Sequence, residues 1–140
     1  MTSVITGSKD NDFMMNKQVA QHTVLGVEGE AAAISHLKRN GYTIRNTRWH
    51  CGHLELDIVA EKEGILVVFE VKTRSTSEYG DPADAVSDRK IRRIVNATDG
   101  YLRYYKLDLP VRFDIISIIK QPDGRFDIEH IEDAFVSPIF

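Results

Sequence analysis

Two stretches near the middle of the chain carry the clearest strand patterns. Residues 54–61 alternate between apolar and polar side chains, which is typical of a half-buried strand. Residues 65–71 are almost continuously apolar and rich in branched and aromatic side chains, which predicts a central strand covered on both faces. The residues between them are polar and end in a glycine suited to a tight turn. The pattern predicts a β-hairpin, and the apolar face of its first strand consists of Leu54, Leu56, Ile58 and Ala60.

A two-residue turn at 63–64 fixes which residues of this hairpin face each other. In that register Asp57 lies opposite Glu70, and Glu55 lies opposite Lys72. Directly opposed residues of an antiparallel pair share a face, with Cβ atoms about 4.5–5.5 Å apart. A slip of one residue would break this arrangement. The hairpin therefore gathers acids and a lysine at its open end.

The opposed acids favour a metal site over a simple ion-pair cluster. An ion-pair cluster at the sheet edge explains Glu55 and Lys72, but it leaves Asp57 against Glu70, which costs free energy unless a cation or proton lies between them. Carboxylates without thiolate partners favour Mg²⁺ or Mn²⁺. Such an ion can polarise a phosphoryl oxygen and activate a water molecule. Lys72 shares the face of Glu70 and could stabilise the charge that develops during that reaction or assist in deprotonating the water.

The rest of the chain predicts helices and strands around the hairpin. Helical periodicity ends at Asn40-Gly41, a common helix stop. Glu30 lies in this helix among small residues, and the local sequence is equally compatible with a solvated acid and a functional one. The later helix has a potential break at 99–100. The predicted elements are a helix at 25–40, strands at 42–49, 54–61 and 65–71, a helix at 83–106, and strands at 111–120 and 125–131.

The solvent side of the second predicted helix is basic. Such a face is usually only solvated, but this one follows directly on the acidic hairpin, which makes contact with phosphate an equal alternative. A polar loop at 73–82 separates the two. The basic residues are Arg89, Lys90, Arg92, Arg93, Arg103 and Lys106.

Length and composition indicate an ordinary soluble protein. With 140 residues, 42% of them hydrophobic, and a net charge of −3, the chain fits one domain at 22–140 after a flexible tail at 1–21. No membrane-spanning run or secretory signal is apparent, so we expect a cytoplasmic protein. The single cysteine, Cys51, excludes an internal disulfide. His50 and His53 flank it too closely to favour a metal site.

Several of these motifs resemble those of a known family. Asp57 followed by Glu70-Val71-Lys72 resembles the Asp…Glu-x-Lys signature of the PD-(D/E)XK nuclease superfamily. More narrowly, residues 25–132 resemble the bacterial YraN/UPF0102 family, which is described as endonuclease-like and related to archaeal Holliday junction resolvases. The matching motifs are Gly26-x-x-Gly29-Glu30-x-x-Ala33, Gly41-Tyr42, Glu55-Leu56-Asp57-Ile58-Val59-Ala60, Phe69-Glu70-Val71-Lys72-x-Arg74 and Arg112-Phe113-Asp114.

The resemblance implies a fold and a set of functional residues. The fold would be α/β with a restriction-endonuclease-like core, a mixed β-sheet flanked by helices in the order α-β-β-β-α-β-β. The metal would be held by Asp57, Glu70 and the Val71 carbonyl, with Lys72 catalytic and Glu30 as an acid contributed by the first helix. Leu54 departs from the family pattern, where many relatives have glycine, and this leaves the role of Glu55 open.

Together, residues and resemblance predict a metal-dependent endonuclease that cleaves phosphodiester bonds in DNA, including branched DNA. Arg74 and the basic helix residues Arg89, Lys90, Arg92 and Arg93 would bind phosphates. The alternative is a nucleic-acid-binding module that keeps the fold without turnover. Pairing of strand edges would also allow a homodimer.

Overall fold

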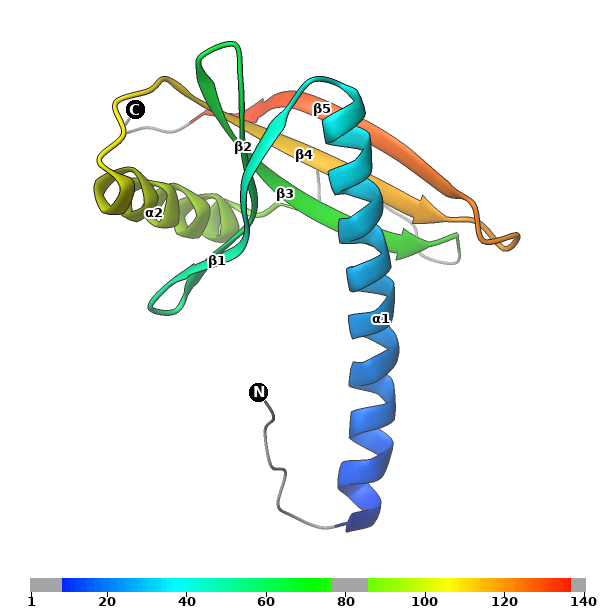
Figure 1. The fold of residues 1–140 in the computed structure, drawn as a ribbon. Helices are drawn as coiled ribbons and strands as arrows, with labels where there is room; N and C mark the ends of the chain where they lie inside the picture. Colours follow the sequence, from blue (N-terminus) through cyan, green and yellow to red (C-terminus); the bar gives the residue numbers. More distant parts are fainter. Residues whose placement is uncertain (1–8, 77–85, 137–140) are drawn as a thin grey trace.

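The chain forms a five-stranded mixed sheet with one helix on each face. The structure, a computed structural model, describes residues 9–76 and 86–136, with side chains from residue 24 onward. The strands lie in the order β1-β2-β3-β4-β5, and only β3 and β4 run parallel (Figure 1). This confirms the predicted α/β class and element order. The elements are α1 (Lys9–Arg39), β1 (Thr43–Cys51), β2 (Leu54–Lys62), β3 (Ile65–Ser75), α2 (Asp88–Tyr105), β4 (Val111–Lys120) and β5 (Phe126–Phe135).

Two apolar clusters show how the helices cover the sheet. On one face, Ala33 and Leu37 of α1 pack with buried residues of β2, β3 and β4. On the other face, Ile94, Val95 and Tyr101 of α2 pack with a different set from β2, β3 and β4. The β3 strand is apolar on both sides, as its continuous hydrophobic pattern predicts. No described helix is long and apolar enough to cross a membrane.

The predicted register of the central hairpin is confirmed from its turn as far as the pair Ile58–Phe69, where the ladder ends before Asp57 and Glu70. Lys62 pairs with Ile65 and Ile58 pairs with Phe69, as a two-residue turn at 63–64 requires. Both turn residues have positive φ, at 53° for Glu63 and 78° for Gly64, which the favoured two-residue hairpin turn demands. Continuing this register by one step brings Asp57 towards β3 at the open end of the hairpin.

The predicted strict alternation of β2 is wrong at Asp57. Leu56 packs on the α2 face, whereas Ile58 packs on the α1 face, so the alternation changes sides between them. The ladder with β3 ends at Ile58, and the neighbouring β1 residue Arg48 has a positive φ of 48°. The sheet is therefore locally irregular at Asp57, and this irregularity opens the space around that carboxylate.

Both helices differ from their predicted extents. The tail expected at 1–21 is helical from Lys9 onward as part of α1, because no glycine or proline interrupts the chain between Lys9 and Gly26. Its first half extends away from the sheet (Figure 1). The break expected at 99–100 is absent, because α2 is continuous to Tyr105 and packs against the sheet on either side of that position.

Gly29 places α1 against the edge of the candidate site. A Cβ atom at this position would overlap the hydroxyl of Thr73 and would lie 2.8 Å from Thr73 Cβ, so rotation of the threonine cannot relieve the clash. We expect Gly29→Ala to lower the free energy of unfolding by about 1–3 kcal/mol. Urea denaturation measures this loss. Gly26→Ala is the matched control, because nothing lies within 4 Å of its added carbon; an equal effect of both substitutions would contradict the close contact.

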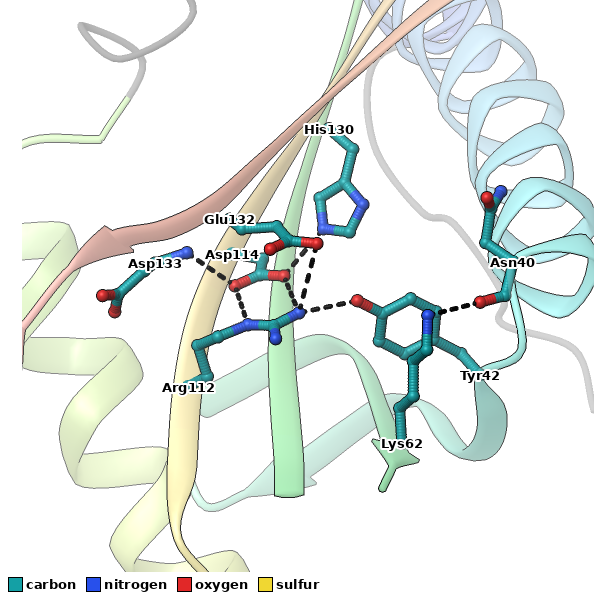
Figure 2. Close-up of polar contacts among 8 residues, drawn as sticks. All are labelled: Asn40, Tyr42, Lys62, Arg112, Asp114, His130, Glu132 and Asp133. Atoms are coloured by element: carbon teal, nitrogen blue, oxygen red, sulfur yellow. Dashed lines mark hydrogen bonds and ion pairs between the residues drawn. The ribbon is translucent and has the colours of Figure 1, made fainter. Parts of the chain in front are cut away.

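A buried network of charges ties β4 to β5 and to Tyr42, in the turn between α1 and β1. Asp114 is fully buried, and its carboxylate accepts two hydrogen bonds from Arg112, at 2.9 and 2.8 Å, and lies 2.7 Å from Nε2 of His130 (Figure 2). Arg112 also donates to the hydroxyl of Tyr42 at 2.6 Å. Burial alone would raise the pKa of Asp114, but these donors hold that pKa below its ordinary value.

This network also explains an irregularity in the last hairpin. The β4–β5 register shifts between Phe113 and Ile115, and Asp133 on the opposite strand has a φ of 51°. The backbone N–H of Asp133 donates to Asp114 at 2.9 Å. The carboxylate thereby replaces a missing ladder bond. The Arg112-Phe113-Asp114 motif therefore has a structural role at this bulge.

Candidate functional site

The carboxylate of Asp57 is bound to the backbone of the neighbouring strand. The N–H of Val71 donates to its Oδ2 atom at 2.9 Å. This bond forms where the β2–β3 ladder has ended, so the side chain satisfies a backbone donor that the ladder no longer reaches. Asp57 is thereby fixed at the fork between the two strands, and its second oxygen accepts no protein hydrogen bond among the described residues.

The environment of Asp57 strongly disfavours its charge. Burial, together with the negative charges of Glu70 and Glu55, raises the pKa of this carboxyl from 3.8 to about 7. The bond from Val71 and the positive charge of Lys90 oppose the rise without cancelling it. A raised pKa from burial and like charges is common at functional sites. At neutral pH a divalent cation would meet a carboxylate that has few competing stabilising partners.

A pocket of about 440 Å³ lies between α1 and the hairpin. It brings together four of the residues predicted for the site, since Glu30, Asp57, Val71 and Lys72 all line it. Lys72 is exposed there. Glu30, however, is already paired, because Arg48 Nε donates to its carboxylate at 2.9 Å. The helix acid predicted from the resemblance is therefore at the site but has a cation as its partner.

A second pocket of about 270 Å³ lies on the α2 side and contains the other predicted acid. Glu70 lines this pocket, and its carboxylate lies 3.0 Å from Nζ of Lys90. Asp57 and Glu55 line both pockets, so they connect the two sides. Burial lowers the pKa of Lys90, but the charge and hydrogen bond of Glu70 outweigh this and raise it. Within the described part of the chain, Lys90 rather than Lys72 contacts a site carboxylate.

The site can contribute only part of a metal coordination shell. Among the described residues, no three His, Cys, Asp or Glu side chains converge closely enough to hold a metal ion. Mg²⁺ commonly uses one or two carboxylates and completes its shell with water and substrate phosphates. Asp57, with Glu55 and Glu70 close enough to raise its pKa, fits that kind of site. It does not fit a closed cage made only of protein ligands.

Glu55 does not form the predicted pair with Lys72. Its carboxylate lies 3.5 Å from Nε2 of His50, its cross-strand partner on β1. The ladder of paired residues between β2 and β3 ends at Ile58, three residues before it would reach Glu55. The two strands separate before reaching this point, so the predicted opposition is lost.

The predicted phosphate-binding residues separate into two groups. Arg89, Lys90, Arg92 and Arg93 are all exposed on α2, and Arg93 lines the second pocket, where it donates to the carbonyl of His53 at 3.2 Å. Arg74 is instead buried, with 8% of its surface exposed. The loop predicted at 73–82 begins too early, because β3 continues to Ser75 and pairs with β4 there. Arg74 therefore belongs to a central strand and does not lie on the basic surface.

Comparison with known proteins places the chain in a family. The model of the uncharacterised protein family UPF0102 matches residues 29–118. The chain belongs to the UPF0102 family. It is 53% identical over 122 residues to a UPF0102 protein of Phocaeicola vulgatus and 51% identical over the same length to one of Bacteroides fragilis, covering 87% of this chain and 100% of each relative. A UPF0102 protein of Flavobacterium psychrophilum is 45% identical over 117 residues, or 84% of this chain and 98% of the relative.

Two cations of this UPF0102 chain were not predicted as partners of the site acids. Arg48 reaches Glu30 from β1, and Lys90 reaches Glu70 from α2. Lys90 follows the helix N-cap Ser87 by three residues, and a helix that connects parallel neighbours β3 and β4 must begin near the end of β3. The N-cap serine and the start of this helix could therefore have located Lys90 from the sequence. The position of Arg48 depends on its positive φ, which an arginine in the sequence does not indicate.

Proposed function

We propose that this UPF0102 chain is a metal-dependent nuclease that hydrolyses phosphodiester bonds in DNA. The observation that carries the proposal is the carboxylate of Asp57, whose pKa burial and neighbouring acids raise to about 7. It lies beside a lysine in an open pocket. A structural acid of a sheet would ordinarily be exposed or paired with a cation. Asp57 forms no ion pair within the described part of the chain, in contrast to Glu30 and Glu70.

The predicted site residues of the two pockets each have a role in this proposal. Asp57 would hold Mg²⁺ or Mn²⁺ together with Glu70 and the Val71 carbonyl, and Glu30 would bind it directly or through water after leaving Arg48. The bound ion would supply Lewis-acid activation of the phosphoryl group and of a water molecule. The Lys72 ammonium would stabilise negative charge that develops on the phosphate. The bond from Val71 to Asp57 keeps that carboxylate oriented.

The exposed basic residues of α2 support a polyanionic substrate. Arg93 and Lys90 line the same pocket as Asp57 and Glu70, so phosphates held by them would be adjacent to the acids. Lys90 would exchange Glu70 for a phosphate when a metal neutralises the acid. Binding through several such cations weakens steeply as salt is added. In this proposal, Lys90 changes its partner from Glu70 to a phosphate as the metal binds at Asp57.

A second candidate is a nucleic-acid-binding module without turnover. The ion pairs Glu30–Arg48 and Glu70–Lys90 favour it, because they neutralise two of the three predicted metal ligands without any metal. In that case the basic face of α2 would bind phosphate while the acids stay paired. Binding would persist in EDTA, and no added metal would produce cleavage.

A cleavage assay of the wild type beside Lys72→Ala distinguishes the two candidates. For a nuclease, we expect cleavage of a labelled branched DNA in Mn²⁺ to fall about a hundredfold or more, because one stabilising donor at the reacting phosphate is lost. The thermal unfolding midpoint should not change, since Lys72 is exposed. Lys38→Ala, another exposed lysine, is the control and should cleave like the wild type. Full activity of Lys72→Ala would contradict its assignment, and wild-type cleavage in EDTA would contradict metal dependence.

A further inference from the structure

An aromatic pocket lies beside the carboxylate site, between β1 and α2. Its volume is about 550 Å³, within the range of roughly 300–1,000 Å³ that is typical of ligand pockets. None of the proposed metal ligands lines it. The lining residues are Trp49, His50, Cys51, Gly100, Arg103, Tyr104 and Tyr105.

The aromatic rings of this pocket pack on a buried tyrosine, and one of them is exposed to solvent. Trp49 packs edge-to-face on the buried ring of Tyr101, with ring centroids 5.1 Å apart. The hydroxyl of Tyr101 donates to Asn46 at 2.6 Å and accepts from Arg45 at 2.8 Å. Tyr104 lies 6.3 Å from Trp49 and is 71% exposed. A rigid base with one exposed aromatic ring is suited to stacking on a flat ligand.

Gly100 keeps the floor of the pocket open. It lies inside α2, where glycine costs about 1 kcal/mol relative to alanine. A Cβ atom there would lie 3.2 Å from Sγ of Cys51 and 3.9 Å from the Trp49 ring. Gly100 therefore allows β1 and α2 to approach while the space beside Trp49 stays open.

Arg103 gives the pocket one exposed cation that can bind a phosphate of the backbone. Arg103 is 80% exposed and pairs with Asp99 on the same helix at 3.1 Å. Exposed pairs of this kind contribute little to stability, so Arg103 can exchange Asp99 for a phosphate at small cost. On the other side, His50 lines the aromatic pocket and lies 3.5 Å from Glu55, which lines both carboxylate pockets. The aromatic pocket is thus adjacent to the proposed reaction site, and the cross-strand pair His50–Glu55 lies between the two.

We propose that this pocket binds an unpaired base of a nucleic-acid strand, stacked on Tyr104 and Trp49, while the backbone of that strand passes Glu55 towards Asp57. The inference rests on the proposed function, because it specifies the substrate as one with an unpaired nucleotide next to the bond that is cleaved. Base-paired nucleotides keep their faces in the duplex stack and cannot occupy the pocket without unstacking. Selectivity for frayed, flapped or branched strands would follow from this single subsite.

The test uses Trp49 as its own reporter, because it is the only tryptophan of the chain. Oligothymidylate of 20 nucleotides is titrated in EDTA, so that no cleavage is needed, and both tryptophan fluorescence and anisotropy of a labelled strand are recorded. We expect quenching in the wild type, and an affinity at least fivefold lower in Tyr104→Ala, since stacking on one aromatic ring commonly contributes that much or more. Tyr104→Phe keeps the ring and should bind like the wild type. The ring is exposed, so the alanine variant should fold normally.

The outcomes separate this inference from the nuclease proposal. Equal affinity of Tyr104→Ala and the wild type, or an equal loss of affinity for a blunt duplex of the same length, would overturn the stacking site, whether or not the protein cleaves DNA. A fluorescence change that depends on protein concentration alone, and disappears in Tyr104→Ala, would overturn it too and identify a surface between two copies of the chain. Tyr104-dependent quenching by the single strand, without metal-dependent cleavage, would support the subsite and contradict only the nuclease.

Discussion

Asp57→Asn is expected to abolish metal-dependent cleavage and, at the same time, to make the protein more stable at alkaline pH. The first effect follows because asparagine cannot supply the charge that draws a divalent cation. The second follows because the substitution removes a buried charge that the fold tolerates poorly. Residues that only support a fold show the opposite trend, since their loss lowers stability. A gain in stability with a loss of activity would mark Asp57 as a residue retained for function.

The stability effect has a definite sign and pH window. The pKa of Asp57 is 3.8 in the ordinary state and about 7 in the fold, so between these values the unfolded chain has released a proton that the native protein still holds. The free energy of unfolding then decreases as pH rises. By pH 8 the accumulated cost is roughly 2–4 kcal/mol. In Asp57→Asn this cost is absent at every pH.

Urea denaturation at pH 5 and pH 8 measures the difference between the wild type and Asp57→Asn. Glu129→Gln is the matched control, because it also removes one carboxylate from a strand, but from an exposed position on β5. The control should keep the pH dependence of the wild type and its activity. If Asp57→Asn is less stable than the wild type at pH 8, or cleaves DNA normally, the proposed role of Asp57 is contradicted.

Asp114→Asn should be the most destabilising of the substitutions considered. Removing one partner of a buried ion pair typically costs about 3–5 kcal/mol, because the other charge is left uncompensated. Here Arg112 and His130 both lose their anion. The pKa of Asp114 lies below its ordinary value, so its contribution is complete above the unfolded-state pKa and is lost as pH falls through the folded one. The wild type should therefore lose stability in acid more steeply than the variant.

Asp133→Asn provides the comparison that isolates this effect. Asp133 contributes only its backbone N–H to the network, its side chain is exposed, and asparagine tolerates its φ of 51° well. Its stability should stay within about 0.5 kcal/mol of the wild type. Urea denaturation measures the free energy of unfolding of both variants. An equal loss of that free energy in Asp114→Asn and Asp133→Asn would mean that the bulge itself, rather than the buried charge of Asp114, stabilises this edge.

The central hairpin was predictable because its information is local. A two-residue turn and a period of two fix which residues pair, so Ile58 and Phe69 are partners as expected. The change of face at Asp57 was not predictable in the same way. It depends on the side chain of Asp57, which binds the backbone N–H of Val71 on another strand. Alternation of apolar and polar residues does not indicate such a bond.

The ion-pair partners of the site acids were also not predictable from the sequence, because they lie far away along the chain. Glu30 and Glu70 were correctly selected as residues that reach the pockets, yet their cations come from other elements, 18 and 20 residues away along the chain. Arg74 illustrates the converse, since a polar composition predicted a loop where β3 in fact continues. Motifs identified acids that line the pockets. Packing of the helices decided which cations meet them.

The measurement that tests the central claim most directly is calorimetric titration with Mn²⁺ of the wild type, Asp57→Asn and Glu129→Gln, at pH 8 and pH 6. The account predicts binding by the wild type and the control at pH 8. It predicts affinity about tenfold lower at pH 6, where protons compete for a carboxyl with a pKa of about 7. Asp57→Asn should show no binding at either pH. Equal binding by Asp57→Asn and the wild type, or no binding by the wild type at pH 8, would contradict a metal site built on Asp57.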